Sequence, residues 1–272
     1  MAKAFSSLKN WIFLAGLAFP GLLIAAERWV STSPQLTELV YQLDLSRFLV
    51  GTSEASDYPP EARSLPRVGK LFQVNLESVL KLQPTRVFWD SASFQPALHS
   101  KLVQLGIGSE RVSLTHVNEL FEAAQYFMRL ADHRQPSPLF EKAQRVWMQA
   151  QKEPLNFKYL ALAWMDPPIL FGRETFFVSL LNSLGAKGLF PLQWSTEFLK
   201  VSEEWLIAQT PERVIFLSHN DQSTQRFKQK CRQWWPKNTP PCQAVPADHF
   251  ARASFTPVLN LQELSPTSES KP

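Results

Sequence analysis

The stretches 75–89 (NLESVLKLQPTRVFW) and 202–216 (SEEWLIAQTPERVIF) share one pattern and lie 127 positions apart. Each stretch predicts a short helix, a stop marked by proline and an apolar strand, and the shared register aligns Glu77 with Glu204. A unit that recurs once in each half of the chain predicts two similar α/β lobes. Each lobe then exposes a glutamate in the first turn of an equivalent helix, and two lobes imply a cleft.

Short apolar runs alternate with amphipathic helices through most of the chain. The pattern predicts strands at 29–32, 48–52, 86–89, 111–114, 157–165, 213–218 and 243–245, and helices from Pro34 and at 76–82, 96–105, 117–131, 139–152, 175–184, 202–209 and 224–235. Strands that alternate with helices indicate two Rossmann-like lobes with parallel central sheets covered on both faces. The glycine-free helix at 139–152 should join the lobes and restrict them to small movements.

These boundaries predict an N-terminal α/β lobe at 27–132, a linker with the backbone helix at 133–155 and a C-terminal α/β lobe at 156–264. Residues 1–26 place two lysines before an apolar run broken by Pro20, which is typical of a cleavable signal peptide. A membrane anchor is the alternative, but the run is shorter than the roughly 20 residues of a spanning helix. The mature protein is therefore expected in the periplasm, with a disordered tail at 265–272.

Charge and cysteine content limit the partners. The chain has 28 Lys and Arg against 24 acids, and two of those lysines lie within residues 1–26, so the mature surface is close to neutral. Without a basic cluster, a nucleic-acid partner is not expected. Cys231 and Cys242 are the only cysteines, and in an oxidising compartment they can form a disulfide.

No catalytic constellation is visible in the sequence. The five histidines are scattered without metal-ligand spacing, and the common hydrolase, metalloprotease and nucleotide-binding motifs are absent. We therefore predict no enzyme activity, no resident cofactor and no structural metal site. An enzyme on a similar two-lobed fold is the alternative from another class, and it would need metal-ligating cysteines or histidines in the cleft.

Several longer segments resemble one family. RWVSTSPQLTELVYQL, VGTSEASDYPPEARSLPRVG and NLESVLKLQPTRV, with DPPILFGRETF and ADHFARAS in the second half, resemble the helical-backbone class of periplasmic substrate-binding proteins of ABC importers. That class carries cobalamin, haem and iron-siderophores. The resemblance covers nearly the whole mature chain and is strongest to members that carry cobalamin. It implies a monomer that holds a corrinoid between its lobes, with haem or a ferric siderophore as the alternative ligand.

The resemblance also implies roles for individual residues. Glu77 and Glu204 match the glutamates that meet arginines on the two transmembrane subunits of the permease, although favourable positions at helix N-termini would also explain them. Asp248 and Arg252 match ligand contacts, with an internal ion pair as the alternative. A macrocycle also needs flat apolar walls. The candidates for these walls are Tyr58, Phe72, Trp89, Phe171, Trp194 and Phe198.

Overall fold

The computed structural model describes residues 27–133, 135–191 and 197–265, and the predicted signal peptide lies outside these ranges, as does the tail from residue 266. The helices are α1 (Pro34–Gln42), α2 (Leu76–Lys81), α3 (Pro96–Gln104), α4 (Val117–Leu130), α5 (Pro138–Ala150), α6 (Phe176–Ser183), α7 (Glu203–Ile207), α8 (Asp221–Trp234), α9 (Ala247–Phe250) and α10 (Phe255–Leu259). The strands are β1 (Trp29–Ser31), β2 (Leu49–Thr52), β3 (Gly69–Lys70), β4 (Gln73–Val74), β5 (Arg86–Asp90), β6 (Gly108–Val112), β7 (Lys158–Met165), β8 (Pro168–Phe171), β9 (Lys187–Gly188), β10 (Phe198–Lys200), β11 (Arg213–Ser218) and β12 (Cys242–Pro246).

The N-terminal lobe is built on a parallel sheet with the order β2-β1-β5-β6. Side chains alternate between its two faces, as in any strand. Trp29 and Phe88 pack with α1 and α4 on one face, whereas Val87 and Trp89 pack with α2 and α3 on the other. The sheet is therefore parallel and covered on both faces, as the alternating pattern predicted.

The sheet of the C-terminal lobe is mixed, with the order β10-β8-β7-β11-β12 and β9 paired to β7. Strands β7, β11 and β12 are parallel, whereas β8 runs antiparallel to β7, and β10 at the edge runs antiparallel to β8. A tight reversal between Met165 and Pro168 folds β8 back along β7. Neither β8 nor β10 was predicted, because both strands are short and β8 follows β7 with no helix between them.

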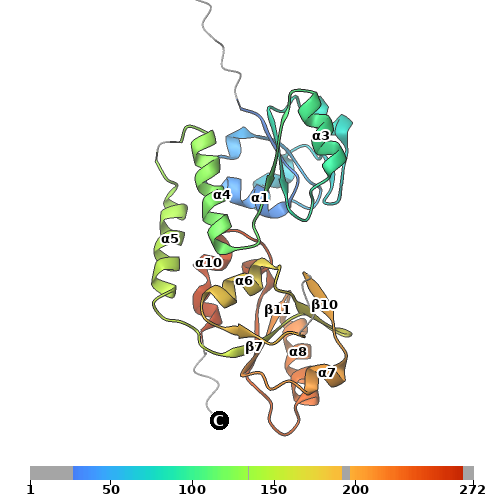
Figure 1. Ribbon diagram of the computed structural model, residues 1–272, viewed down its shortest axis with the longest axis vertical. Helices are drawn as coiled ribbons and strands as arrows, with labels where there is room; N and C mark the ends of the chain where they lie inside the picture. Colours follow the sequence, from blue (N-terminus) through green and yellow to red (C-terminus); the bar gives the residue numbers. More distant parts are fainter. Residues whose placement is uncertain (1–26, 134, 192–196, 266–272) are drawn as a thin grey trace, which may run out of the picture.

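The two lobes share one hydrophobic core. Helix α5 runs along both lobes on one side of the molecule, and α6 and α10 lie where the lobes meet (Figure 1). Phe121 of α4, Phe140 of α5 and Phe255 of α10 form an aromatic cluster with ring centroids 5.8–6.0 Å apart. Because this core continues from one sheet to the other, a wide separation of the lobes would expose apolar surface.

A buried carboxylate reinforces this junction. Glu38 of α1 is only 2% exposed, and its Oε1 accepts hydrogen bonds from the hydroxyls of Ser254 (2.6 Å) and Thr256 (2.7 Å). The neighbouring Gln42 also donates to this oxygen and accepts from the backbone N–H of Phe255. One turn of α1 thus binds the segment that leads from the C-terminal sheet into α10.

The predicted disulfide is confirmed. Cys231 of α8 is bonded to Cys242 at the start of β12, and it ties the outer helix to the edge strand of the C-terminal sheet. A disulfide that closes such a short loop stabilises the folded state by about 2–3 kcal/mol, because it lowers the entropy of the unfolded chain. Within the described ranges, no helix combines the length and the apolar character that crossing a bilayer requires.

We expect Glu38→Ala to lower the free energy of unfolding by about 2–4 kcal/mol, because three donors at the lobe junction lose their acceptor. Urea denaturation followed by circular dichroism measures this loss. Glu122→Ala, at an exposed position of α4, is the matched control. A loss below about 0.5 kcal/mol for Glu38→Ala, the usual range for surface positions, would contradict the assigned role.

Candidate functional site

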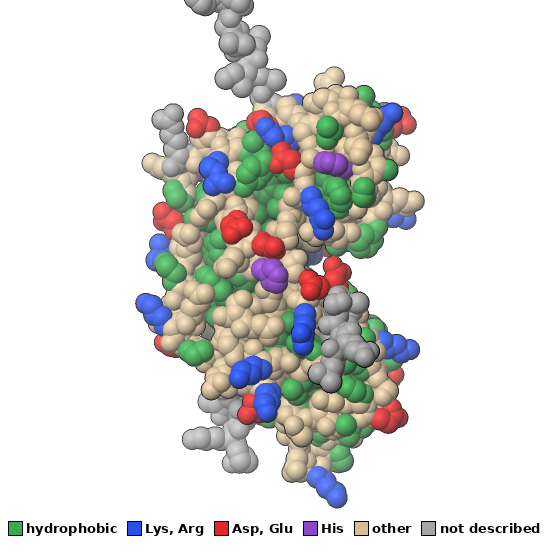
Figure 2. Space-filling view, viewed as in Figure 1, with side chains coloured by type: hydrophobic (Ala, Val, Ile, Leu, Met, Phe, Trp, Pro, Cys, Tyr) green, Lys and Arg blue, Asp and Glu red, His purple; other side chains and the backbone are tan. Residues whose placement is uncertain are grey.

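A cavity of about 180 Å³ lies between the lobes. Its N-terminal wall consists of residues at and after the carboxyl ends of β5 and β6, together with one residue of α1. Its C-terminal wall comes from the end of β8, the start of α6, the start of β10 and the segment around α9. The residues that line the cavity include Gln35, Asp90, Thr115, Phe171, Glu174, Phe177, Glu197, Phe198 and Phe250. The carboxyl edge of a parallel sheet is where open α/β folds bind ligands. Figure 2 shows the corresponding hollow between the lobes on the right side of the molecule.

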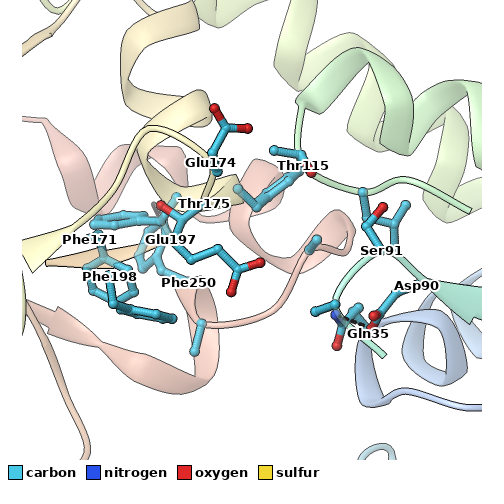
Figure 3. A pocket seen from close by; sticks show the side chains of 16 residues that line it. Gln35, Asp90, Ser91, Thr115, Phe171, Glu174, Thr175, Glu197, Phe198 and Phe250 are labelled. Atoms are coloured by element: carbon cyan, nitrogen blue, oxygen red, sulfur yellow. Dashed lines mark hydrogen bonds between the residues drawn. The ribbon is translucent and has the colours of Figure 1, made fainter. Parts of the chain in front are cut away.

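Aromatic rings form the C-terminal wall (Figure 3). The centroid of Phe171 lies 5.5 Å from those of Phe177 and Phe198, and Phe177 lies 5.7 Å from Phe250. Phe198, at the mouth of the cavity, is 52% exposed. The wall can therefore hold a flat, partly apolar ligand.

Polar groups form the opposite wall. Asp90, at the end of β5, is 2% exposed and accepts hydrogen bonds from Nε2 of Gln35 and from the backbone N–H of Ser93, both at 2.6 Å. These donors fix the carboxylate without neutralising its charge. Asp90 can in turn accept from N–H or O–H donors of a ligand only through its remaining lone pairs.

A carboxylate network holds the loop that carries Thr115. Glu119 of α4 accepts from the hydroxyl of Ser113 and from the backbone N–H groups of Thr115 and His116 at 2.7–3.0 Å. His116 then contacts the hydroxyl of Ser179 on α6, across the lobe junction, at 2.8 Å. Partial burial raises the pKa of Glu119, but these donors outweigh it, and the pKa lies below the ordinary value of 4.5.

The predicted aromatic contacts divide into three groups. Phe171 and Phe198 do line the cavity. Tyr58 and Phe72 are exposed, at 48% and 69%, and neither is among the lining residues. Trp194 lies outside the described residues. The assignment of Trp89 to the cleft is wrong: its side chain is fully buried on the α2 and α3 face, and its indole N–H donates to Ser109.

The predicted pair of Asp248 and Arg252 does not share a helix face. Helix α9 ends at Phe250, and Arg252 reaches the N-terminal lobe instead, where Nη2 lies 2.9 Å from Asp57 Oδ1 and Nη1 lies 3.9 Å from Glu38 Oε2. Asp248 is exposed and is not among the cavity residues. The alternative of an ion pair between Asp248 and Arg252 is therefore wrong, and Arg252 joins the two lobes.

The two lobe-surface glutamates occupy equivalent positions. Asn75 caps α2 by accepting from Ser78 N, and Ser202 caps α7 by accepting from Trp205 N, again with an offset of 127. Glu77 and Glu204 are both exposed. The repeat therefore extends from the sequence to the capping geometry.

The surroundings of the two glutamates differ. The carboxylate of Glu77 lies 2.9 Å from Lys81. The pKa of Glu204 is lowered by its own backbone N–H and by the Ser202 hydroxyl. The equivalent of Lys81 in the second unit is Ala208.

Sequence reasoning missed the polar cavity residues Gln35, Asp90, Glu174 and Glu197. Asp90 could have been found, because it directly follows the predicted strand at 86–89, at the edge where such folds bind ligands. Glu174 and Glu197 have no comparable signal, since both lie in irregular segments of the second lobe. Within the described ranges, no cluster of three or more His, Cys, Asp or Glu side chains could hold a metal ion.

Comparisons with known proteins agree on one family. Residues 30–109 match the family described as periplasmic binding protein. A protein of Salmonella typhi named vitamin B12-binding protein is 28% identical over 264 residues, which cover 91% of this chain and 92% of the relative. A protein of the same name from Yersinia pestis (strain Pestoides F) is 29% identical over 264 residues, covering 91% and 88%.

Solved structures share the fold. The periplasmic vitamin B12 binding protein BtuF of Vibrio cholerae is 22% identical, with a TM-score of 0.69 and coverage of 88% of this chain and 95% of that chain. The periplasmic heme-binding protein BhuT in complex with two hemes is 16% identical, with a TM-score of 0.68 and coverage of 88% and 97%. These likenesses show the two-lobed fold, and they include proteins with different ligands.

Acid should weaken the fold through Glu119. Because its folded pKa is depressed, the stability that it contributes is present above about pH 4.5 and is lost as the pH falls through the folded pKa. We expect Glu119→Gln to be less stable than the unmodified protein near neutral pH and to lose less stability between about pH 6 and about pH 3. Urea midpoints across this range measure the difference. Parallel pH profiles for the two proteins would contradict the assignment.

Proposed function

We propose that this chain, which belongs to the periplasmic binding protein family, captures a corrinoid such as cobalamin between its lobes and delivers it to a dimeric ABC permease. Members of this family are substrate-binding components of transport systems. The proposal takes the ligand class from the relatives named vitamin B12-binding proteins, which align over about nine tenths of the chain. We further propose that residues 1–26 direct export to the periplasm.

The observation that carries the proposal is the cavity between the lobes, with aromatic rings on one wall and hydrogen-bonding groups on the other. A corrin ring has apolar faces and an edge of amide groups, so it matches both walls. The cavity volume of about 180 Å³ is below the roughly 300–1,000 Å³ of common ligand pockets. Most of the ring would therefore lie in the open hollow beyond the cavity.

The ligand assignment has a direct test. Protein without residues 1–26 should bind cyanocobalamin in a one-to-one ratio and keep the red colour after desalting. Phe171→Ala should weaken binding by about tenfold or more, because the wall loses a ring worth about 1.5–3 kcal/mol of apolar burial. Met148→Ala, at an exposed apolar position of α5, is the matched control.

Haem is the second candidate, since solved haem-binding proteins share the fold. Titration with haemin in the same experiment separates the two ligands. A protein that retains haemin and not cyanocobalamin would overturn the corrinoid assignment, and it would leave transport as the function.

The permease contact is proposed at α2 and α7. Glu77 and Glu204 occupy equivalent exposed positions, and each helix also exposes one apolar side chain three residues later, Leu80 at 37% and Ile207 at 44%. A carboxylate pairs with arginine through strong, directional hydrogen bonds. Two such pairs on equivalent helices fit a partner with two-fold symmetry, which is how most homodimers are built.

We expect the double variant Glu77→Ala and Glu204→Ala to bind the ligand normally and to lose uptake, because only the contact with the permease is removed. Transport of labelled cyanocobalamin into cells or into vesicles with the permease measures the effect. The control is the double variant Glu122→Ala and Glu153→Ala, which removes two exposed acids elsewhere. Loss of ligand binding by the first double variant, or equal loss of uptake by the control, would contradict this docking site.

A further inference from the structure

The walls of the cavity carry three carboxylates and no basic side chain among the described residues that line them. Asp90 comes from the N-terminal lobe, whereas Glu174 and Glu197 come from the C-terminal lobe. Figure 3 shows Glu197 pointing across the cavity toward the opposite wall and Glu174 at the rim. Figure 2 shows acidic side chains gathered at the same hollow.

Among the residues that the structure describes, no cation forms an ion pair with these three carboxylates. Asp90 is buried, and the donors that bind it, Gln35 and the Ser93 backbone, are uncharged. Within the described ranges, no salt bridge joins Asp90, Glu174 or Glu197 to a cation. Residues 192–196, which precede Glu197, contain no charged side chain.

Nearby cations are engaged elsewhere. The Arg252 guanidinium lies between Asp57 and Glu38, so this group of three side chains has a net negative charge. Arg173 is next to Glu174 in the sequence, but its guanidinium lies 5.2 Å from the centroid of the Phe190 ring and is not part of the lining. The described lining of the cavity is therefore anionic.

We infer that the cleft selects its ligand by charge, so that it prefers a corrinoid with a net positive charge over the neutral form and rejects macrocycles that carry carboxylates. This inference rests on the proposed function. In aquocobalamin, cobalt(III) outweighs the charges of the corrin ring and the phosphodiester and leaves one positive charge. Cyanide in place of the axial water removes that charge. Ferric haem with two ionised propionates carries a net negative charge.

Two physical effects act in the same direction. The carboxylates attract a cationic ligand and repel an anionic one, and this attraction is strongest where water is excluded. Carboxylates are also acceptors only. They can bind the N–H groups of the corrin side-chain amides, but they cannot donate to a propionate.

The test compares aquocobalamin with cyanocobalamin, because the two differ only in the axial group. Dissociation constants are measured at mildly acidic pH, so that the axial water stays protonated. In about 10 mM salt, aquocobalamin should bind about threefold to tenfold more tightly. In about 300 mM salt, where the Debye length is below about 8 Å, the two constants should approach each other.

Variants assign the selectivity to named side chains. The double variant Glu174→Gln and Glu197→Gln should reduce the ratio of the two constants to below about twofold. The matched control, Glu122→Gln with Glu153→Gln, removes the same amount of charge at two exposed positions that do not line the cavity. It should keep the ratio of the unmodified protein. The visible spectrum of bound aquocobalamin must match that of the free form, which excludes exchange of the axial water for a protein side chain.

The outcomes separate the two proposals. If cyanocobalamin binds but the ratio is near unity, or if the control lowers it as much as the cleft variant does, charge selection is overturned and the corrinoid function stands. A spectral change on binding with an unaltered ratio in the cleft variant would also overturn it. If neither corrinoid binds, the proposed function itself fails, and the inference fails with it.

Discussion

The buried carboxylate of Glu38 is the contact on which the arrangement of the two lobes depends. It lies on α1, beside the carboxyl edge of the N-terminal sheet, and it accepts hydrogen bonds from Ser254 and Thr256 of the other lobe. A carboxylate at 2% exposure is costly unless donors surround it. The hydrogen bonds that stabilise this buried charge therefore also fix the distance between the lobes, and with it the width of the cleft.

The shared core and this contact together define what the cleft can do. Phe121, Phe140 and Phe255 pack around the junction, and Arg252 adds an ion pair to Asp57. Elements so connected resist hinge opening, because a wide rotation would break buried polar contacts and expose apolar surface. A ligand would then enter from the open side of the cleft, and its binding would not need a large closing movement of the lobes. Recognition in such a site depends on preformed walls, which favours a rigid ring as ligand.

Local signals made most of the fold predictable from the sequence. Asn75 and Ser202 cap two of the predicted helices, and Pro84 and Pro211 follow the ends of these helices, where the sequence marks a stop. Such signals operate within a few residues, so a single sequence contains them.

The errors arose where several arrangements fit the same residues. Phe88 and Trp89 are adjacent and both buried, so an apolar run in a sheet covered on both faces does not show which ring faces which side. Arg252 pairs with Asp57, 195 positions away, and no local pattern predicts such a contact.

The two-fold repeat is imperfect in a way that bears on docking. Lys81 already pairs with Glu77, whereas the equivalent position in the second unit is Ala208. An exposed pair of this kind is worth about 0.3–0.5 kcal/mol, so Glu77 can exchange Lys81 for a stronger partner at small cost. Glu204 has no such cation on its own helix, since neither Trp205, Leu206 nor Ile207 carries a charge. A symmetric partner would therefore meet two carboxylates in equivalent positions, of which only Glu77 is already paired with a cation on its own helix. The C-terminal lobe would then form the stronger of the two contacts.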